Sequence, residues 1–189
     1  MRKRPDLLTY LVSGDSDIHP SHENIRRSGR RVRHGKEVDG DARLALRTGR
    51  RYVVVAHGNR QGTTVSWFRE DWSGAQRWLY VGMKRPPKGV RLYLYSCYAG
   101  KGLPRFLKKS EVFGHTHEVP TPTGVSKDIV LGLFAEVEAL FKLPEFDREH
   151  WRTTLGEYIN RLLVAEAQQR TTIWAAAILQ ILRKSLGYP

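Results

Sequence analysis

Two short apolar runs, each ending in a reactive side chain and a glycine, constrain the fold of this chain more than any other feature. The first reads Tyr52-Val-Val-Val-Ala-His57-Gly58, and the second reads Arg91-Leu-Tyr-Leu-Tyr-Ser96-Cys97-Tyr-Ala-Gly100. Their β-branched and aromatic residues predict strands. Because polar and apolar residues barely alternate in either run, we expect both faces of these strands to be covered, as in a parallel sheet.

The end of each run supplies a group that can do chemistry. His57 follows the first run, and Cys97, the only cysteine of the chain, follows the second. In an open parallel sheet the carboxyl ends of the strands form one rim, where ligands bind. An imidazole and a thiol on one rim are a candidate nucleophile and its proton-transfer partner. A lone cysteine is most often a small buried apolar residue, so the inference depends on the two blocks together.

The order of the two blocks resembles a known family. A strand-His-Gly block followed by strand-Cys-x-x-Gly is similar to the caspase-like cysteine peptidases, which include caspases, metacaspases, clostripain and gingipain relatives, and bacterial CHAT-type peptidases. Ser96-Cys97-Tyr98-Ala99-Gly100 has the Cys-x-x-Gly spacing of metacaspases and CHAT-type chains, and a histidine upstream of the cysteine fits the caspase pattern. The resemblance covers roughly residues 52–143, with 7–20 as a first strand.

This resemblance implies a cysteine endopeptidase with a Cys-His dyad. Cys97 would attack the scissile carbonyl to form a thioester acyl-enzyme, and His57 would transfer the protons. The backbone N–H groups of Gly58 and Cys97 would receive the oxyanion. The family needs no third acid, no metal and no cofactor. Many relatives cleave after Arg or Lys with an acidic pocket, for which Asp15, Asp17 and Glu118 are candidates; turn roles for these residues, and a preference for acidic substrates, stay open.

The pattern along the chain predicts an α/β fold, a three-layer αβα sandwich with a mainly parallel sheet, followed by C-terminal helices. Residues 1–143 are expected to form the catalytic core, and residues 144–189 a helical extension packed on it. The expected strands are 7–13, 52–56, 64–68, 90–96 and 111–114. The expected helices are 41–48, 73–80, 102–109, 126–143, 147–164 and 166–186, and residues 14–40 are expected to be loop.

The chain carries a net charge of +13, and much of it lies in one segment, residues 26–51. Such a segment suits an acidic protein partner or an anionic regulator; a solvated basic loop is an equal alternative. Zinc-finger spacing and an aromatic RNA-binding signature are lacking, which gives nucleic-acid binding no further support. The partner required by the resemblance is a protein or peptide substrate.

The remaining composition points to the cytoplasm. With 189 residues and one cysteine, the chain has no intrachain disulfide, which fits a reducing compartment. The longest apolar stretch, 173–182, contains Gln180 and is too short to span a bilayer. The first residues, Met1-Arg-Lys-Arg-Pro5, lack an apolar stretch, so we expect no secretory signal.

A different enzyme class competes for part of the sequence. Gly114-His115-Thr116-His117 is similar to the closing metal-ligand motif of calcineurin-like metallophosphoesterases, and Asp17-Ile18-His19 is similar to their opening Asp-x-His. These side chains are suitable ligands for a dinuclear metal centre. The intermediate motifs of that family are missing: Gly58-Asn59 is followed by Arg60 instead of His.

A third alternative is an inert caspase-like scaffold that only binds a partner. Loss of His57 or Cys97 would have favoured it, and both residues are present. Metal content separates the two enzyme classes, because a phosphoesterase would purify with transition metal and a cysteine peptidase would not.

Overall fold

The structure is a computed structural model, and it describes most of the sheet and the C-terminal half of the chain. The described residues are 8–13, 18–34, 49–58, 60, 66–69, 76–78, 89–101, 111–169 and 173–189.

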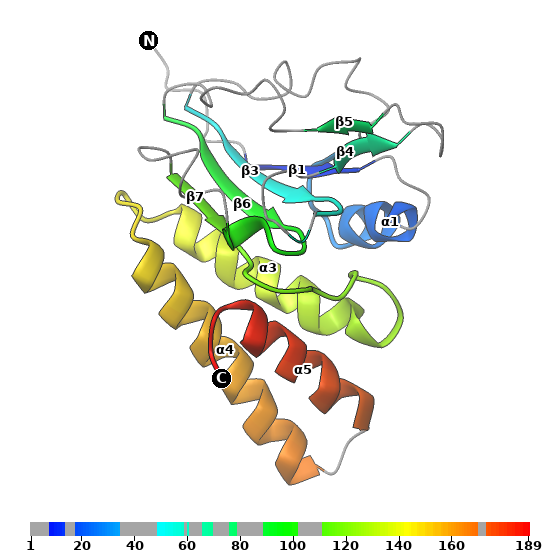
Figure 1. Cartoon of the computed structure of the whole chain (residues 1–189), viewed down its shortest axis with the longest axis vertical. Helices are drawn as coiled ribbons and strands as arrows, with labels where there is room; N and C mark the ends of the chain where they lie inside the picture. The colour runs from blue at the N-terminus through cyan, green and yellow to red at the C-terminus, as the bar shows by residue number, and fades with distance from the viewer. Residues whose placement is uncertain are drawn as a thin grey trace.

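A five-stranded, all-parallel sheet forms the centre of the fold (Figure 1). Its strands are β1 (Leu8–Val12), β2 (Val32–His34), β3 (Arg51–Val55), β6 (Arg91–Tyr95) and β7 (Glu111–Gly114). They lie in the order β2-β1-β3-β6-β7. The chain therefore reverses its direction of travel across the sheet between β1 and β3. The α/β sandwich with a parallel sheet is confirmed, and the histidine strand β3 and the cysteine strand β6 are direct neighbours.

Both faces of the sheet are buried, which explains why its strands read as continuous apolar runs. On one face Tyr10, Val53 and Tyr93 belong to the core that the helices cover. On the opposite face Val54 and Leu94 are equally inaccessible to solvent. Because successive strand residues point to opposite sides, a strand covered on both sides cannot alternate between polar and apolar residues.

The helices after the sheet pack on that same core. A 3-10 turn, η3 (Gly124–Ser126), leads into α3 (Lys127–Phe141), α4 (Arg148–Gln169) and α5 (Ile173–Ser185). Figure 1 shows α3 against the sheet, with α4 and α5 beyond it. Trp151 of α4 and Leu179 of α5 belong to one apolar cluster with Phe134 of α3 and with the sheet. The C-terminal helices therefore share the core of the sheet. Of the described helices, none is long and apolar enough to cross a membrane.

Residues 14–40, expected to be loop, contain a helix and a strand. Helix α1 (His19–Arg27) connects β1 to the edge strand β2. Its sequence, HPSHENIRR, is mostly polar, with Ile25 as its one large apolar residue, so its pattern does not predict a helix that packs on the sheet. The helix is held by Ile25, which is buried in the core together with Ile18 at its N-cap, and by Pro20, which suits the first turn of a helix.

A second correction concerns the segment after β3, where residues 73–80 were expected to be helical. Residues 76–78 instead form β5 (Gln76–Trp78), which pairs antiparallel with β4 (Ser66–Arg69). Strand pairing prevails here over a weak local helix pattern, because intrinsic propensities are small compared with tertiary contacts. The helix expected at 41–48 and most of the one expected at 102–109 lie outside the described residues.

Candidate functional site

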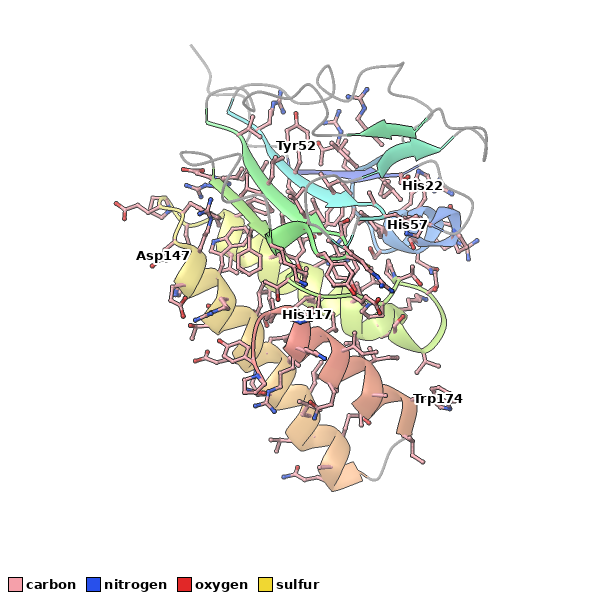
Figure 2. The ribbon with its side chains drawn as sticks, viewed as in Figure 1. His22, Tyr52, His57, His117, Asp147 and Trp174 are labelled. Atoms are coloured by element: carbon pink, nitrogen blue, oxygen red, sulfur yellow. The ribbon has the colours of Figure 1, made fainter. Side chains whose placement is uncertain are left out.

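His57 and Cys97 occupy equivalent positions at the carboxyl ends of neighbouring strands. The register of β3 and β6 pairs Arg51 with Arg91 and Val55 with Tyr95, a constant offset of 40 residues. His57 and Cys97 are separated by that same offset, two positions beyond the last paired residues. Figure 2 shows His57 just past the end of β3. Both residues are half-buried, so they lie at the rim of the sheet.

Gly58 lies directly against the backbone of the cysteine loop. A Cβ atom at this position would overlap the carbonyl oxygen of Cys97 and would come within 2.7 Å of Ser96 Oγ. Only glycine can be accommodated this close to another backbone segment. Gly58 therefore fixes the approach of the histidine loop to the cysteine loop. The expected oxyanion role of the Gly58 and Cys97 N–H groups stays a prediction.

The chain turns sharply away from the sheet after Cys97. Tyr98 has a φ of 59°, a left-handed conformation that is uncommon outside glycine. The turn is fixed by the next loop along the sheet, because Tyr98 N–H donates to the carbonyl of His117 (3.0 Å) and Gly100 N–H donates to that of His115 (2.7 Å). A Cβ atom on Gly100 would overlap the carbonyl oxygen of Gly114, so this second contact also requires glycine.

The Cys97 thiol is in a shielded environment in this structure. Burial raises the pKa of Cys97, and the nearby Glu118 carboxylate raises it further. Backbone N–H groups of Val119 and of Cys97 itself partly offset this rise in the pKa of Cys97. Sγ also lies 3.9 Å from the carbonyl oxygen of Val119. The thiol is consequently protonated at neutral pH, and a base must remove its proton before it can act as a nucleophile.

The three acidic candidates for a substrate pocket have different outcomes. Glu118 lies at the rim and is exposed, and its carboxylate accepts a hydrogen bond from the Tyr98 hydroxyl (3.0 Å). It is thus held beside the cysteine loop. Asp15 and Asp17 lie outside the described residues.

His115, the first histidine of the Gly-His-Thr-His motif, follows β7 and is completely buried. Its Nε2 lies 2.6 Å from the Tyr93 hydroxyl and its Nδ1 lies 2.6 Å from Ser185 Oγ. Ser185 uses its single proton on the carbonyl of Leu182, so Nδ1–H must donate to Ser185 and Nε2 must accept from Tyr93.

The buried ring is therefore neutral, and both of its nitrogens are in use. Burial lowers the pKa of His115 to about 3. The residue lacks a free lone pair for a metal ion, which it would need as a ligand in the phosphoesterase alternative. Within the described part of the chain no three His, Cys, Asp or Glu side chains gather closely enough to hold a metal. Asp17 and the His19 side chain are not described.

Several residues of this region carried no signal in the sequence. Ser96, next to the cysteine, is fully buried, and its hydroxyl has no hydrogen-bond partner in the described structure. The sequence around Tyr98 contains no sign of the left-handed backbone conformation of this residue. Ser185 is distant in sequence from the motif that it supports, and only a tertiary contact reveals it.

The basic segment 26–51 is not a uniform loop of free charges. Arg26 and Arg27 both pair with Glu23 on α1, and hydrogen bonds from Arg26 and then Arg27 lower the pKa of Glu23 to about 2. Arg30 pairs with Glu138 of α3. Several of these arginines thus have intramolecular partners, which sequence could not indicate because Glu138 lies far along the chain. Residues 35–48 of the segment lie outside the described residues.

Comparison with known proteins adds no relative: no protein-family model, no curated protein and no solved structure matches this chain.

Proposed function

We propose that this protein is a cysteine endopeptidase of the caspase-like type, with Cys97 as the nucleophile and His57 as the general acid-base. The observation that carries the proposal is the shared register position of His57 and Cys97 at the carboxyl ends of β3 and β6. β3 borders the point between β1 and β3 where the strand order reverses, and β6 is the next strand along. Ligand sites of open α/β sheets form at such points.

The chemistry follows from the order of proton transfers. His57 accepts the proton of the Cys97 thiol as sulfur forms a bond to the carbonyl carbon of the substrate, and the carbonyl oxygen becomes an oxyanion. The backbone N–H groups of Gly58 and Cys97 donate hydrogen bonds to that oxygen. The carbon–nitrogen bond then breaks, the departing amine takes the proton from His57, and a thioester remains. Water activated by His57 cleaves the thioester and regenerates the thiol.

The raised pKa of Cys97 makes the histidine essential to this scheme. A thiol that is already ionised needs no base, whereas a protonated thiol reacts only when its proton is removed at the moment of attack. Substrate binding over the rim also displaces water, which strengthens the interaction of the thiol with a neighbouring imidazole. Glu118, exposed beside Cys97, is the proposed contact for a basic side chain of the substrate.

The direct test compares four proteins on fluorogenic peptides that carry Arg, Lys or Asp before the scissile bond. Cys97→Ala is expected to abolish turnover. His57→Ala is expected to reduce kcat by about 100-fold or more, because a positioned acid-base contributes that much. His117→Ala is the matched control: its side chain lies at the same rim, and the backbone carbonyl that binds Tyr98 is retained. It is expected to keep most of the activity.

A binding scaffold without turnover is the second candidate, and the raised pKa of Cys97 is the observation that favours it. If the wild-type protein cleaves none of the peptides and its thiol also fails to react with a peptidyl chloromethyl ketone, the scaffold is the better description. Turnover that survives in Cys97→Ala and stops with a chelator would point to the phosphoesterase class instead.

A further inference from the structure

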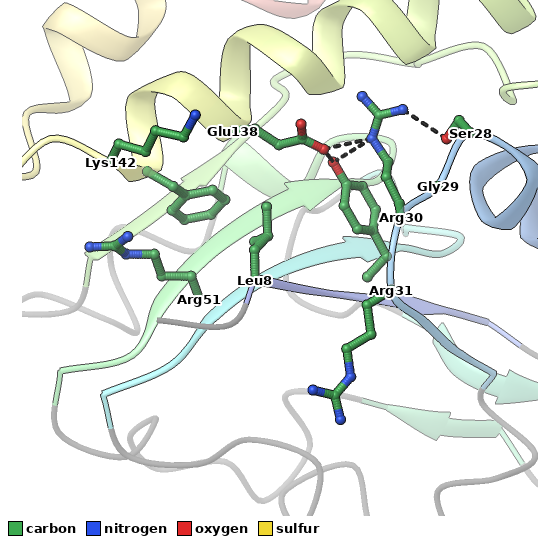
Figure 3. A pocket seen from close by; sticks show the side chains of 10 residues that line it. Leu8, Ser28, Gly29, Arg30, Arg31, Arg51, Glu138 and Lys142 are labelled. Atoms are coloured by element: carbon green, nitrogen blue, oxygen red, sulfur yellow. Dashed lines mark hydrogen bonds and ion pairs between the residues drawn. The ribbon is translucent and has the colours of Figure 1, made fainter. Parts of the chain in front are cut away.

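A second candidate binding site lies at the other end of the strands, away from His57 and Cys97. Here a pocket of about 400 Å³ opens at the amino ends of β1 and β3, beside the link between α1 and β2 and the end of α3 (Figure 3). Its lining comprises Leu8, Tyr10, Ser28, Gly29, Arg30, Arg31, Arg51, Glu138, Phe141 and Lys142. Because His57 and Cys97 follow the carboxyl ends of their strands, this pocket is separate from the proposed peptidase site.

One wall of the pocket is a hydrogen-bonded network around Glu138, the only acidic side chain among the described residues of its lining. The Oε1 atom of Glu138 accepts hydrogen bonds from Arg30 Nε and from the Tyr10 hydroxyl, both at 2.6 Å. Arg30 also donates to Ser28 Oγ (2.8 Å) and to the carbonyl of Leu131 (3.2 Å). Each of the three nitrogens of Arg30 thus has a partner within the protein, and the charge of Glu138 is neutralised within the wall.

The rim of the pocket keeps a positive charge. The described residues of its lining include four cations and one carboxylate. Arg30 and Glu138 compensate each other, and Arg51 has a further interaction within the chain, so two positive charges are left at Arg31 and Lys142. The C-terminal ends of α1 and α3 lie nearby and offset this by about half a charge each, so an excess remains. The side chains of Arg31 and Lys142 have neither a hydrogen bond nor an ion pair within the described part of the chain. Figure 3 shows Arg51 and Lys142 on one side of Leu8 and Arg31 on the other.

The pocket is not purely ionic. Leu8 is half-buried and presents apolar surface between the cations, and the almost completely buried rings of Tyr10 and Phe141 form part of the wall behind it. The pocket volume lies within the range that holds small organic ligands. We infer that the pocket binds a small phosphate-bearing ligand of the nucleotide class, with its phosphates at Arg31 and Lys142 and its ring over Leu8.

The inference is tested by calorimetric titration of the full chain with ADP, adenosine and inorganic pyrophosphate at low salt. ADP is expected to bind at least about tenfold more tightly than adenosine, because charge-assisted hydrogen bonds to phosphate dominate. It should also bind more tightly than pyrophosphate, because only ADP has a ring. The affinity for ADP should fall as salt rises. Cys97→Ala should bind ADP like the wild type, which keeps this test independent of the peptidase proposal.

Two substitutions locate the ligand. Arg31→Gln and Lys142→Gln are each expected to weaken ADP binding by about tenfold, whereas Lys184→Gln, which removes an exposed charge from the last turn of α5, should not. All three side chains are at the surface, and thermal unfolding checks that each variant is folded. The inference is overturned if ADP does not bind, if adenosine or pyrophosphate binds as tightly as ADP, or if Lys184→Gln weakens binding as much as the pocket variants.

Discussion

His115 donates from Nδ1 to Ser185 Oγ at 2.6 Å, and this bond joins the loop after β7 to the last turn of α5. Thr116 strengthens the connection, because its backbone N–H (2.6 Å) and its hydroxyl (3.0 Å) both donate to the Ser185 carbonyl. The same loop accepts the hydrogen bonds that fix Tyr98 and Gly100 after the cysteine. The C-terminal helix therefore supports the loop beside Cys97 through a short chain of direct contacts.

Removal of the Ser185 hydroxyl tests this connection. Ser185→Ala leaves the buried Nδ1–H of His115 without an acceptor, so we expect the free energy of unfolding to fall by about 1–3 kcal/mol. Urea unfolding measures the change. Thr153→Ala, which removes a hydroxyl from the exposed side of α4, should change stability by less than about 0.5 kcal/mol. Equal effects of the two substitutions would show that the buried bond contributes nothing specific.

Acid should destabilise the fold through His115. The pKa of this ring is lowered from 6.5 to about 3 in the folded state, so the unfolded chain takes up the proton first as the pH falls. The stability that comes from keeping the ring neutral is complete above about pH 6.5 and is lost as the pH falls from there toward about 3, at up to about 1.4 kcal/mol per pH unit. Urea unfolding at a series of pH values measures this slope.

His115→Gln provides the comparison for that slope, because glutamine keeps a donor and an acceptor but does not titrate. This variant should be less stable than the wild type near neutral pH and should lose less stability on acidification. His117→Gln, at the half-buried histidine of the same motif, should keep the wild-type slope. A wild-type slope in His115→Gln would assign the acid sensitivity to other groups.

Close backbone approach at Gly58 predicts a severe effect of the smallest side chain. Gly58→Ala would place a methyl group on the Cys97 carbonyl oxygen, a backbone atom that cannot move without distorting β6. We expect a loss of about 2 kcal/mol or more, in line with other strained core substitutions, together with lost peptidase activity. Gly29→Ala is the control: this residue has a φ of 82° but no atom within 4 Å of the added Cβ, so only about 1–2 kcal/mol of backbone strain is expected.

The protonation state of Cys97 predicts slow alkylation. Burial, followed by the charge of Glu118, raises the pKa of the thiol, and iodoacetamide reacts with the thiolate. At about pH 8, near the ordinary cysteine pKa, the native protein should react more slowly than the urea-unfolded chain. Glu118→Gln should increase the native rate. As Cys97 is the only cysteine, intact mass reports the modification directly. A native rate that exceeds the unfolded rate would indicate a thiolate that is already stabilised.

The parallel sheet and the placement of its reactive residues could be predicted from the sequence. The runs before His57 and Cys97 are apolar on both faces, and they become adjacent strands in a register that keeps the two residues level. The helix after η3 was equally clear, because its apolar residues repeat at helical spacing. These features depend on local pattern, and local pattern is contained in the sequence.

The environment of each side chain depends on tertiary contacts and could not be predicted from the sequence. Nothing near His115 in sequence indicates that Ser185 and Tyr93 enclose it, or that Glu138 neutralises Arg30. The mostly polar sequence of helix α1 did not predict a helix, because only Ile25 and the N-cap residue Ile18 supply its apolar contacts with the core. Burial and charge pairing join residues distant along the chain. These contacts set which groups are protonated, which cations have an internal partner and which glycines cannot be replaced.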